Sequence, residues 1–268
     1  MPAIIEREKY SDSSNDESLQ KSSRHVKNIN HDVESGRPLL NFTFNSTSIR
    51  NAFIRKVFFL VSIMLLVTAL ITSIPFMNSD IRHFVQRSFG LYIISWLLFT
   101  VVYIALMCCE GIRRSYPTNL IFTALLTLSM SLLTMCICAY HDIISVLICL
   151  VITAICCFGI IIFALQTKYD LTSFLGILFI CTLVVFVIGI VAMIAAWIFN
   201  VKWLYIIYAG LAAILFMAYL AVDIQLVMGG KKYEISPEEY IFAAITIFTD
   251  IVYLFWMILG LFGGIQNE

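Results

Sequence analysis

The stretch WLYIIYAGLAAILFMAYLAVDIQLV (Trp203–Val227) joins almost unbroken hydrophobicity to a single carboxylate, Asp223. A second stretch, YIFAAITIFTDIVYLFWMILGLF (Tyr240–Phe262), repeats this combination with Asp250 near its middle. A bilayer core about 30 Å thick needs roughly 20 apolar residues per helix, so each stretch is long enough to cross it. A carboxylate at bilayer depth is costly, usually faces the interior of a helix bundle, and marks a path for ions or protons. Asp223 and Asp250 are therefore the leading candidates for function.

Five further apolar runs precede these two stretches. They are Phe53–Pro75, Phe89–Cys109, Thr118–Ala139, Ile143–Leu165 and Thr172–Ile194. Irregular backbone and open sheet edges are excluded from lipid, so all seven runs should be helices. The sequence predicts an all-α, polytopic membrane protein with seven transmembrane helices.

Composition supports this class and divides the chain in two. Of the 268 residues, 61% are hydrophobic and 13% charged, whereas about a quarter of a soluble domain is charged. The first 56 residues hold nine of the 17 basic residues and seven of the 17 acidic ones. We expect residues 1–50 to form a disordered cytosolic tail and residues 51–268 to form the seven-helix transmembrane domain. The formal net charge of zero gives no reason to expect nucleic acid as a partner.

Basic residues next to the apolar runs predict the orientation in the membrane. With a cytosolic N-terminus, eight lysines and arginines lie in cytosolic segments near the membrane and three on the other side. The eight are Arg50, Arg55, Lys56, Arg113, Arg114, Lys168, Lys231 and Lys232, and the three are Arg82, Arg87 and Lys202. This asymmetry favours a cytosolic N-terminus. A full crossing by the last run places Glu268 outside; the alternative is a re-entrant segment, since Asp250 weakens its hydropathy.

The two aspartates lie in neighbouring antiparallel runs but at different depths. Asp223 is roughly 6 Å from the cytosolic boundary and Asp250 roughly 15 Å, at 1.5 Å per residue. Helix tilt could bring them together, and they would then hold one proton between them and titrate as a pair. Carboxylate oxygens also suit Ca²⁺, so the pair predicts a weak, pH-sensitive cation site. The competing interpretation is that Asp250 only hydrogen-bonds a neighbouring helix, for instance through Thr246 or Tyr253.

Other ionisable residues offer less. Arg113 and Arg114 could reach Asp223 as counter-charges, could extend to lipid headgroups, or could pair with Glu110 one turn earlier. The four histidines lie in the tail or loops, and no nucleophile with a nearby base falls within a span. We therefore expect neither an enzyme nor a bound cofactor.

Several motifs in the chain resemble a known family. They include IRNAFIRKV (Ile49–Val57), FALQTKYDLT (Phe163–Thr172), AVDIQLVMGG (Ala221–Gly230), YEISPEEYIFAA (Tyr233–Ala244) and FTDI (Phe248–Ile251). In this order they are similar to the Bax-inhibitor motif-containing transmembrane family, in its Lifeguard branch. The resemblance runs from about Ile49 to Gly263.

The resemblance implies a seven-helix fold in which the last helix is central. It also implies a pH-sensitive Ca²⁺ leak in cellular membranes that suppresses apoptosis, with Ca²⁺ as the permeant ion and H⁺ as the regulator. The family's paired aspartates, its pH sensor, ion gate and weak Ca²⁺ site, fall on Asp223 and Asp250. Glu238 would lie at the cytosolic pore mouth. The implied location is the endoplasmic reticulum, the Golgi or the plasma membrane.

The chain departs from the branch beside both aspartates. Val222-Asp-Ile-Gln replaces the usual Tyr-Asp-Thr-Gln, and Ile245-Thr-Ile-Phe replaces the usual Leu-Asn-Leu-Tyr. Hydroxyl and amide partners should thus be lost near the carboxylates, which could weaken cation flux. The alternative function is a non-conducting membrane scaffold that inhibits death-receptor or Bcl-2-type signalling, in which the tail would matter most.

Overall fold

The computed structural model describes residues 38–199 and 203–266, and this part of the chain is helical with no strand. Seven of its helices are long and apolar enough to cross a membrane, as predicted. They are α2 (Pro38–Met77), α4 (Phe89–Cys108), α6 (Thr118–Cys138), α7 (Ile143–Gln166), α8 (Leu175–Ile198), α9 (Trp203–Met228) and α10 (Tyr240–Gln266). Four short helices join them: α3 (Ser79–Arg87), α5 (Glu110–Arg114), η1 (Leu171–Phe174) and η2 (Pro237–Glu239).

The contacts divide the chain between Ala52 and Phe53, and the unit from Phe53 onward contains the helix bundle. Helix α2 begins at Pro38, so its first turns fall within the segment 1–50 that we expected to be disordered. The rest of that segment, residues 1–37, lies outside the described residues.

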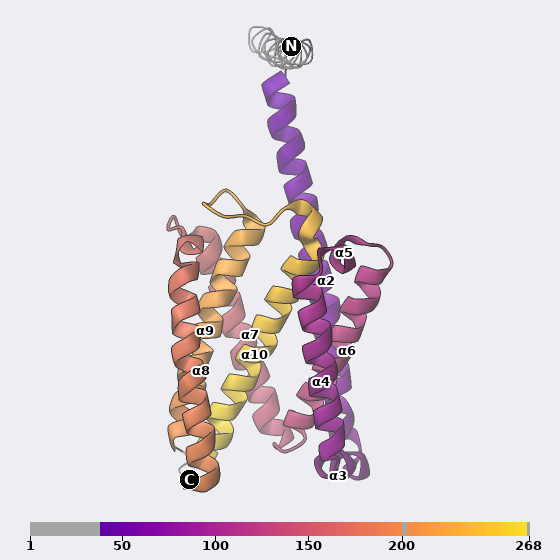
Figure 1. Cartoon of the computed structure of the whole chain (residues 1–268), viewed down its shortest axis with the longest axis vertical. Helices are drawn as coiled ribbons and strands as arrows, with labels where there is room; N and C mark the ends of the chain where they lie inside the picture. The colour runs from indigo at the N-terminus through magenta and orange to yellow at the C-terminus, as the bar shows by residue number, and fades with distance from the viewer. Residues whose placement is uncertain (1–37, 200–202, 267–268) are drawn as a thin grey trace, which may run out of the picture. The chain divides into compact units, whose positions relative to one another are not determined.

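The last helix is central, as the resemblance implied. Helix α10 contacts α9, α7 and α6, and Figure 1 shows it running obliquely between α8 and α9 on one side and α4 and α6 on the other. Within the spans, 61% of the α10 segment is buried inside the protein, against 6% of the segment that includes α8. Helix α10 is also unbroken over 27 residues, which fits a full crossing rather than a re-entrant segment.

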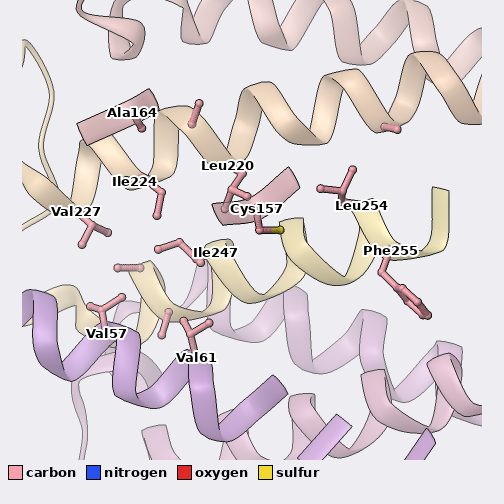
Figure 2. Packing of buried hydrophobic residues seen from close by; sticks show 14 of the residues in the cluster. Val57, Val61, Cys157, Ala164, Leu220, Ile224, Val227, Ile247, Leu254 and Phe255 are labelled. Atoms are coloured by element: carbon pink, nitrogen blue, oxygen red, sulfur yellow. The ribbon is translucent and has the colours of Figure 1, made fainter. Parts of the chain in front are cut away.

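Two apolar clusters hold α10 from opposite faces. On one face, Ile247 and Leu254 pack with side chains of α2, α7 and α9, which Figure 2 shows gathered around α10. On the other face, Ile245, Phe248 and Val252 pack with side chains of α2, α4 and α6. Since lipid tails are as apolar as these side chains, close packing rather than the hydrophobic effect holds such helices together.

Polar side chains add specific links between the helices and the segments that connect them. The Thr68 and Ser131 hydroxyl groups join α2 to α6 at 3.0 Å, and Trp256 Nε1 donates to Thr134 Oγ1 of α6 at 3.1 Å. At the end of the bundle that carries α3, Arg82 donates to the carbonyl oxygens of Ala139 and His141. A cation at this point complements the C-terminal end of the α6 dipole.

Candidate functional site

The structure places Asp223 and Asp250 on α9 and α10, the two helices that pack most extensively together. Both side chains are partly buried, and the two carboxylates are close enough for their charges to interact. Asp223 lies five residues before the end of α9, and Asp250 ten residues after the start of α10. Figure 1 shows that α10 runs obliquely to α9, so the depths of residues on the two helices do not follow from residue counts alone.

The two carboxylates differ in their hydrogen bonding. The Thr246 side chain, one turn before Asp250 on α10, lies within hydrogen-bonding reach of Asp223, and its hydroxyl group also donates to the Ala243 carbonyl oxygen at 3.2 Å. Asp250 Oδ2 is buried and has no hydrogen-bond partner among the described residues. An unpartnered buried polar atom costs about 1–3 kcal/mol, and more if it is charged. Asp250 Oδ2 is therefore the atom at this site that a proton or a cation would stabilise most.

The position of the Thr246 side chain bears on one expectation from the sequence. Residues 245–248 lack the amide of the usual family pattern, and we expected the carboxylates to lose their polar partners. Thr246 instead supplies a hydroxyl to Asp223 across the α9–α10 interface. Sequence comparison could not show this, because Thr246 belongs to the motif around Asp250 but serves the other aspartate.

Tyr103 of α4 is a further neighbour of the pair, which the sequence did not single out. Its phenol lies near both carboxylates and within reach of the Thr249 side chain. Its ring stacks on Phe99, with ring centroids 5.5 Å apart. Phe99 in turn packs edge-on against Tyr253, whose centroid lies 6.4 Å away. A tyrosine in the middle of an apolar run was the available signal, since its hydroxyl group needs a partner when it is buried.

Arg113 and Arg114 have a different partner from those expected. Both contact Glu239, the last residue of η2, with Nε–Oε distances of 2.7 Å each. Arg113 also donates to the carbonyl oxygens of Leu106 and Met107 near the end of α4. Both arginines therefore pair with Glu239 in the structure, and a counter-charge role toward Asp223 stays a prediction. The two arginines and Glu239 form a clamp between α5 and η2, just before α10.

Glu238, the expected pore-mouth residue, is exposed at the same end of the bundle. It lies in η2 next to Glu239, and its backbone N–H donates to the Ser236 side chain. Within the described residues, no group of three or more histidine, cysteine, aspartate or glutamate side chains could hold a metal ion. Any cation at the aspartate pair would therefore need backbone carbonyl or water oxygens to reach the six to eight ligands that Ca²⁺ prefers.

Gln225 fixes the end of α9 that carries Asp223. It is 2% exposed; its side-chain oxygen accepts from Leu171 N–H at 2.8 Å and its amide donates to Tyr169 O at 3.1 Å. Nearby, Lys231 Nζ donates to the carbonyl oxygens of Thr167, Lys168 and Tyr169. These hydrogen bonds hold the connection between α7 and η1 against the end of α9. We call this set of bonds the brace, and Asp223 lies on the part of α9 that it fixes.

Asp170, outside the spans, completes this brace. Its carboxylate accepts from the Thr172 hydroxyl at 2.6 Å and from the Lys232 backbone N–H at 3.0 Å. The bond from Thr172, and with it that from Lys232, lowers the pKa of Asp170 below its usual value. The ionised form is therefore the one that joins the two connections.

Fold and site together define the class: a seven-helix membrane protein with two interacting carboxylates between its last two spans. The chain belongs to the family described as "Inhibitor of apoptosis-promoting Bax1", whose sequence pattern matches residues 50–268. It is thus a member of an anti-apoptotic family of membrane proteins, as its motifs indicated.

Similarity to individual proteins supports the same family. The chain is 40% identical over 220 residues to human "Protein lifeguard 3", covering 82% of this chain and 71% of that protein. It is 37% identical over 221 residues to the mouse protein of the same name, covering 82% of this chain and 72% of the relative. Mouse "Protein lifeguard 4" is 29% identical over 224 residues, covering 83% of this chain and 89% of the relative.

Proposed function

We propose that this protein is a pH-sensitive Ca²⁺ leak channel that suppresses apoptosis by lowering the Ca²⁺ content of the compartment whose membrane holds it. The observation that carries the proposal is Asp250 Oδ2, a buried carboxylate oxygen with no hydrogen-bond partner among the described residues, within the electrostatic reach of a second carboxylate. Such a pair at bilayer depth is a recurrent mark of an ion or proton path.

The proposed gate is the α9–α10 interface. When Asp223 and Asp250 share one proton, a hydrogen bond between them holds the two helices together and the path is closed. When that proton leaves, two like charges remain in a medium of low dielectric constant, where their repulsion is much stronger than in water. The helices then separate, and the carboxylate oxygens become available to a cation. The leak should therefore increase as the pH rises.

Ca²⁺ flux from liposomes that contain the purified full-length protein tests this proposal. Wild type should leak with a pH-dependent rate between pH 6 and 8. In Asp250→Asn the amide can donate a hydrogen bond to Asp223 without any proton from solution, so the leak should be low and independent of pH. Asp80→Asn is a matched control, because it neutralises an exposed carboxylate in α3, away from the site.

Two outcomes would contradict the proposal. If wild type and Asp250→Asn leak identically across this pH range, the aspartates do not form the gate. If neither leaks while the protein still protects cells from apoptosis, the non-conducting scaffold is the better account. Deletion of residues 1–37 separates these functions further: a leak should survive the deletion, whereas a scaffold that acts through its tail should not.

A further inference from the structure

A long groove runs along the membrane-spanning part of the bundle, on a face that the proposed function does not use. Its walls are α2 and α7, its floor includes α10, and it encloses about 800 Å³. That volume lies in the range of sites for small organic ligands, about 300–1,000 Å³. On α2 the lining extends from Phe58 to Phe76, about 27 Å at 1.5 Å per residue. The groove thus follows most of the roughly 30 Å thickness of a hydrocarbon core.

The lining selects an apolar ligand. It carries no lysine, arginine, histidine, aspartate or glutamate; its polar groups are the thiol of Cys157 and a few serine and threonine hydroxyl groups. A hydrated ion or a charged metabolite would lose its solvation there without any compensating partner. An aliphatic chain, in contrast, would exchange one apolar environment for another and gain close packing.

The groove is continuous with the surface that the bilayer covers. Its rim includes Leu66 of α2 and Phe158 of α7, which are 60% and 67% exposed. Its floor includes Val252 and Phe255 of α10, which are 3% and 8% exposed. The molecules that lie against such a rim at bilayer depth are lipid acyl chains, so an acyl chain can enter sideways without crossing water.

One hydroxyl group in the lining lacks a partner. Thr68 bonds back to the carbonyl oxygen of Met64 at 2.9 Å, and Ser73 to that of Leu70 at 2.7 Å, as is common in helices. The Thr72 hydroxyl oxygen is buried and has no partner among the described residues. Thr72 lies five residues before the end of α2, about 8 Å from that end of the span. The ester carbonyl of a lipid in the adjacent leaflet lies at the boundary of the hydrocarbon core and can accept a hydrogen bond from this hydroxyl group.

We propose that this groove is a binding site for an acyl chain of a membrane glycerolipid, which packs against the central helix α10 while the Thr72 hydroxyl donates to its ester carbonyl. The occupant would lie next to Ile247 and Ile251 in the floor, the residues that flank one turn of α10 containing Asp250. Cys157, in the same lining, lies within electrostatic range of the Asp250 carboxylate. The groove therefore lies beside the part of α10 that carries Asp250. The site itself does not depend on whether the protein conducts Ca²⁺.

Photolabelling in vesicles tests the site directly. The full-length protein is reconstituted in phosphatidylcholine that contains a small fraction of the same lipid with a photoreactive group on one acyl chain. After illumination, labelled peptides are mapped by mass spectrometry. Wild type should be labelled on α10 near Val252 and Phe255, although these residues are buried within the protein. Phe179 and Val187 of α8, which are 62% and 58% exposed, give an internal measure of ordinary contact with lipid.

Two variants sharpen the test. The double variant Ala69→Phe/Ala154→Phe fills the groove from both walls and should reduce α10 labelling at least fivefold, with α8 labelling unchanged. Val151→Phe is the matched control, because Val151 lies on α7 at 55% exposure but outside the lining, and its labelling should equal that of wild type. Thr72→Val keeps the shape of the side chain and should weaken α10 labelling.

Three results would overturn the proposal. Labelling of α8 without α10 in wild type would mean that no acyl chain enters the groove. Equal α10 labelling in wild type and the filled variant would place the label elsewhere. Crosslinks from the groove to a second copy of the chain or to residues 1–37 would show that protein, not lipid, covers it. Each result is independent of Ca²⁺ flux, so failure here leaves the proposed channel function standing.

Discussion

The clamp between α5 and η2 allows a sharp prediction, because two arginines bind the same carboxylate at the same distance but differ in burial. Arg113 and Arg114 each lie 2.7 Å from an oxygen of Glu239. The Arg113 side chain is 10% exposed, that of Arg114 is 50% exposed, and that of Glu239 is 12% exposed. Water screens the attraction between Arg114 and Glu239, and it screens the attraction between Arg113 and Glu239 much less.

The change is Arg113→Ala, compared with Arg114→Ala. A hydrogen bond to a charged group contributes about 1.5–3 kcal/mol, and removal of Arg113 also leaves Leu106 O and Met107 O without their donor. We expect Arg113→Ala to lower the free energy of unfolding by about 2–3 kcal/mol, which is a drop in Tm of roughly 4–12 °C for a domain of this size. Arg114→Ala should give a clearly smaller drop, because water replaces its contact.

Thermal unfolding of the purified variants in detergent, followed by tryptophan fluorescence, shows which of the two substitutions lowers Tm more. Arg113→Lys is a useful third variant, because it keeps the charge but not the planar fork that reaches Glu239 and the α4 carbonyl groups together. Equal drops in Tm for Arg113→Ala and Arg114→Ala, or a larger drop for Arg114→Ala, would refute the argument from burial.

Gln225 and Asp170 give two further predictions, which need no flux measurement. Gln225→Leu should destabilise the protein by about 1–3 kcal/mol, because the Leu171 N–H loses its acceptor and the Tyr169 carbonyl oxygen keeps only the bond from Lys231. Unfolding in detergent compares this variant with Gln166→Leu at the end of α7. Asp170 has a lowered pKa in the folded protein, so its contribution to stability is present above the unfolded pKa of about 3.9 and is lost as the pH falls through its folded value. Wild type should therefore lose Tm more steeply than Asp170→Asn as the pH is lowered from 5 to 3, and parallel curves would contradict this role.

The sequence predicts the transmembrane architecture well because lipid removes most alternatives. Backbone groups in hydrocarbon must bond within a helix, so length and hydropathy are enough to find the spans. The same constraint makes Asp223 and Asp250 conspicuous, since nothing in lipid compensates a charge. The sequence did not decide whether the two aspartates interact across the α9–α10 interface, because their interaction depends on the tilt of α10. Side-chain packing sets that tilt, and hydropathy carries no information about it.

Tertiary partners were harder to predict. Arg113 and Arg114 form ion pairs with Glu239, which lies more than a hundred positions away in the sequence. From the sequence alone, Glu110 and Asp223 were equally good candidates for the partner. Tyr103 gave only a weak signal in an apolar run, and its place beside the aspartates follows from the packing of α4 against α6 and α10. Nothing in the sequence indicated the groove between α2 and α7. Leucine and phenylalanine contribute the same hydropathy whether they face a neighbouring helix, a bound acyl chain or the open bilayer.

The central claim is that Asp223 and Asp250 share one proton and that its loss opens a cation path. Infrared spectroscopy of the protein in vesicles, with ¹³C-labelled aspartate, can follow the carbonyl stretch of a protonated carboxyl group as the pH is raised from 6 to 8, beside Ca²⁺ flux from the same vesicles. The account predicts one protonated aspartate per molecule that is lost with the same midpoint at which the leak begins, and no such band in the Asp223→Asn/Asp250→Asn variant. A band that persists in this variant, or a leak that begins without any loss of the protonated group, would contradict it.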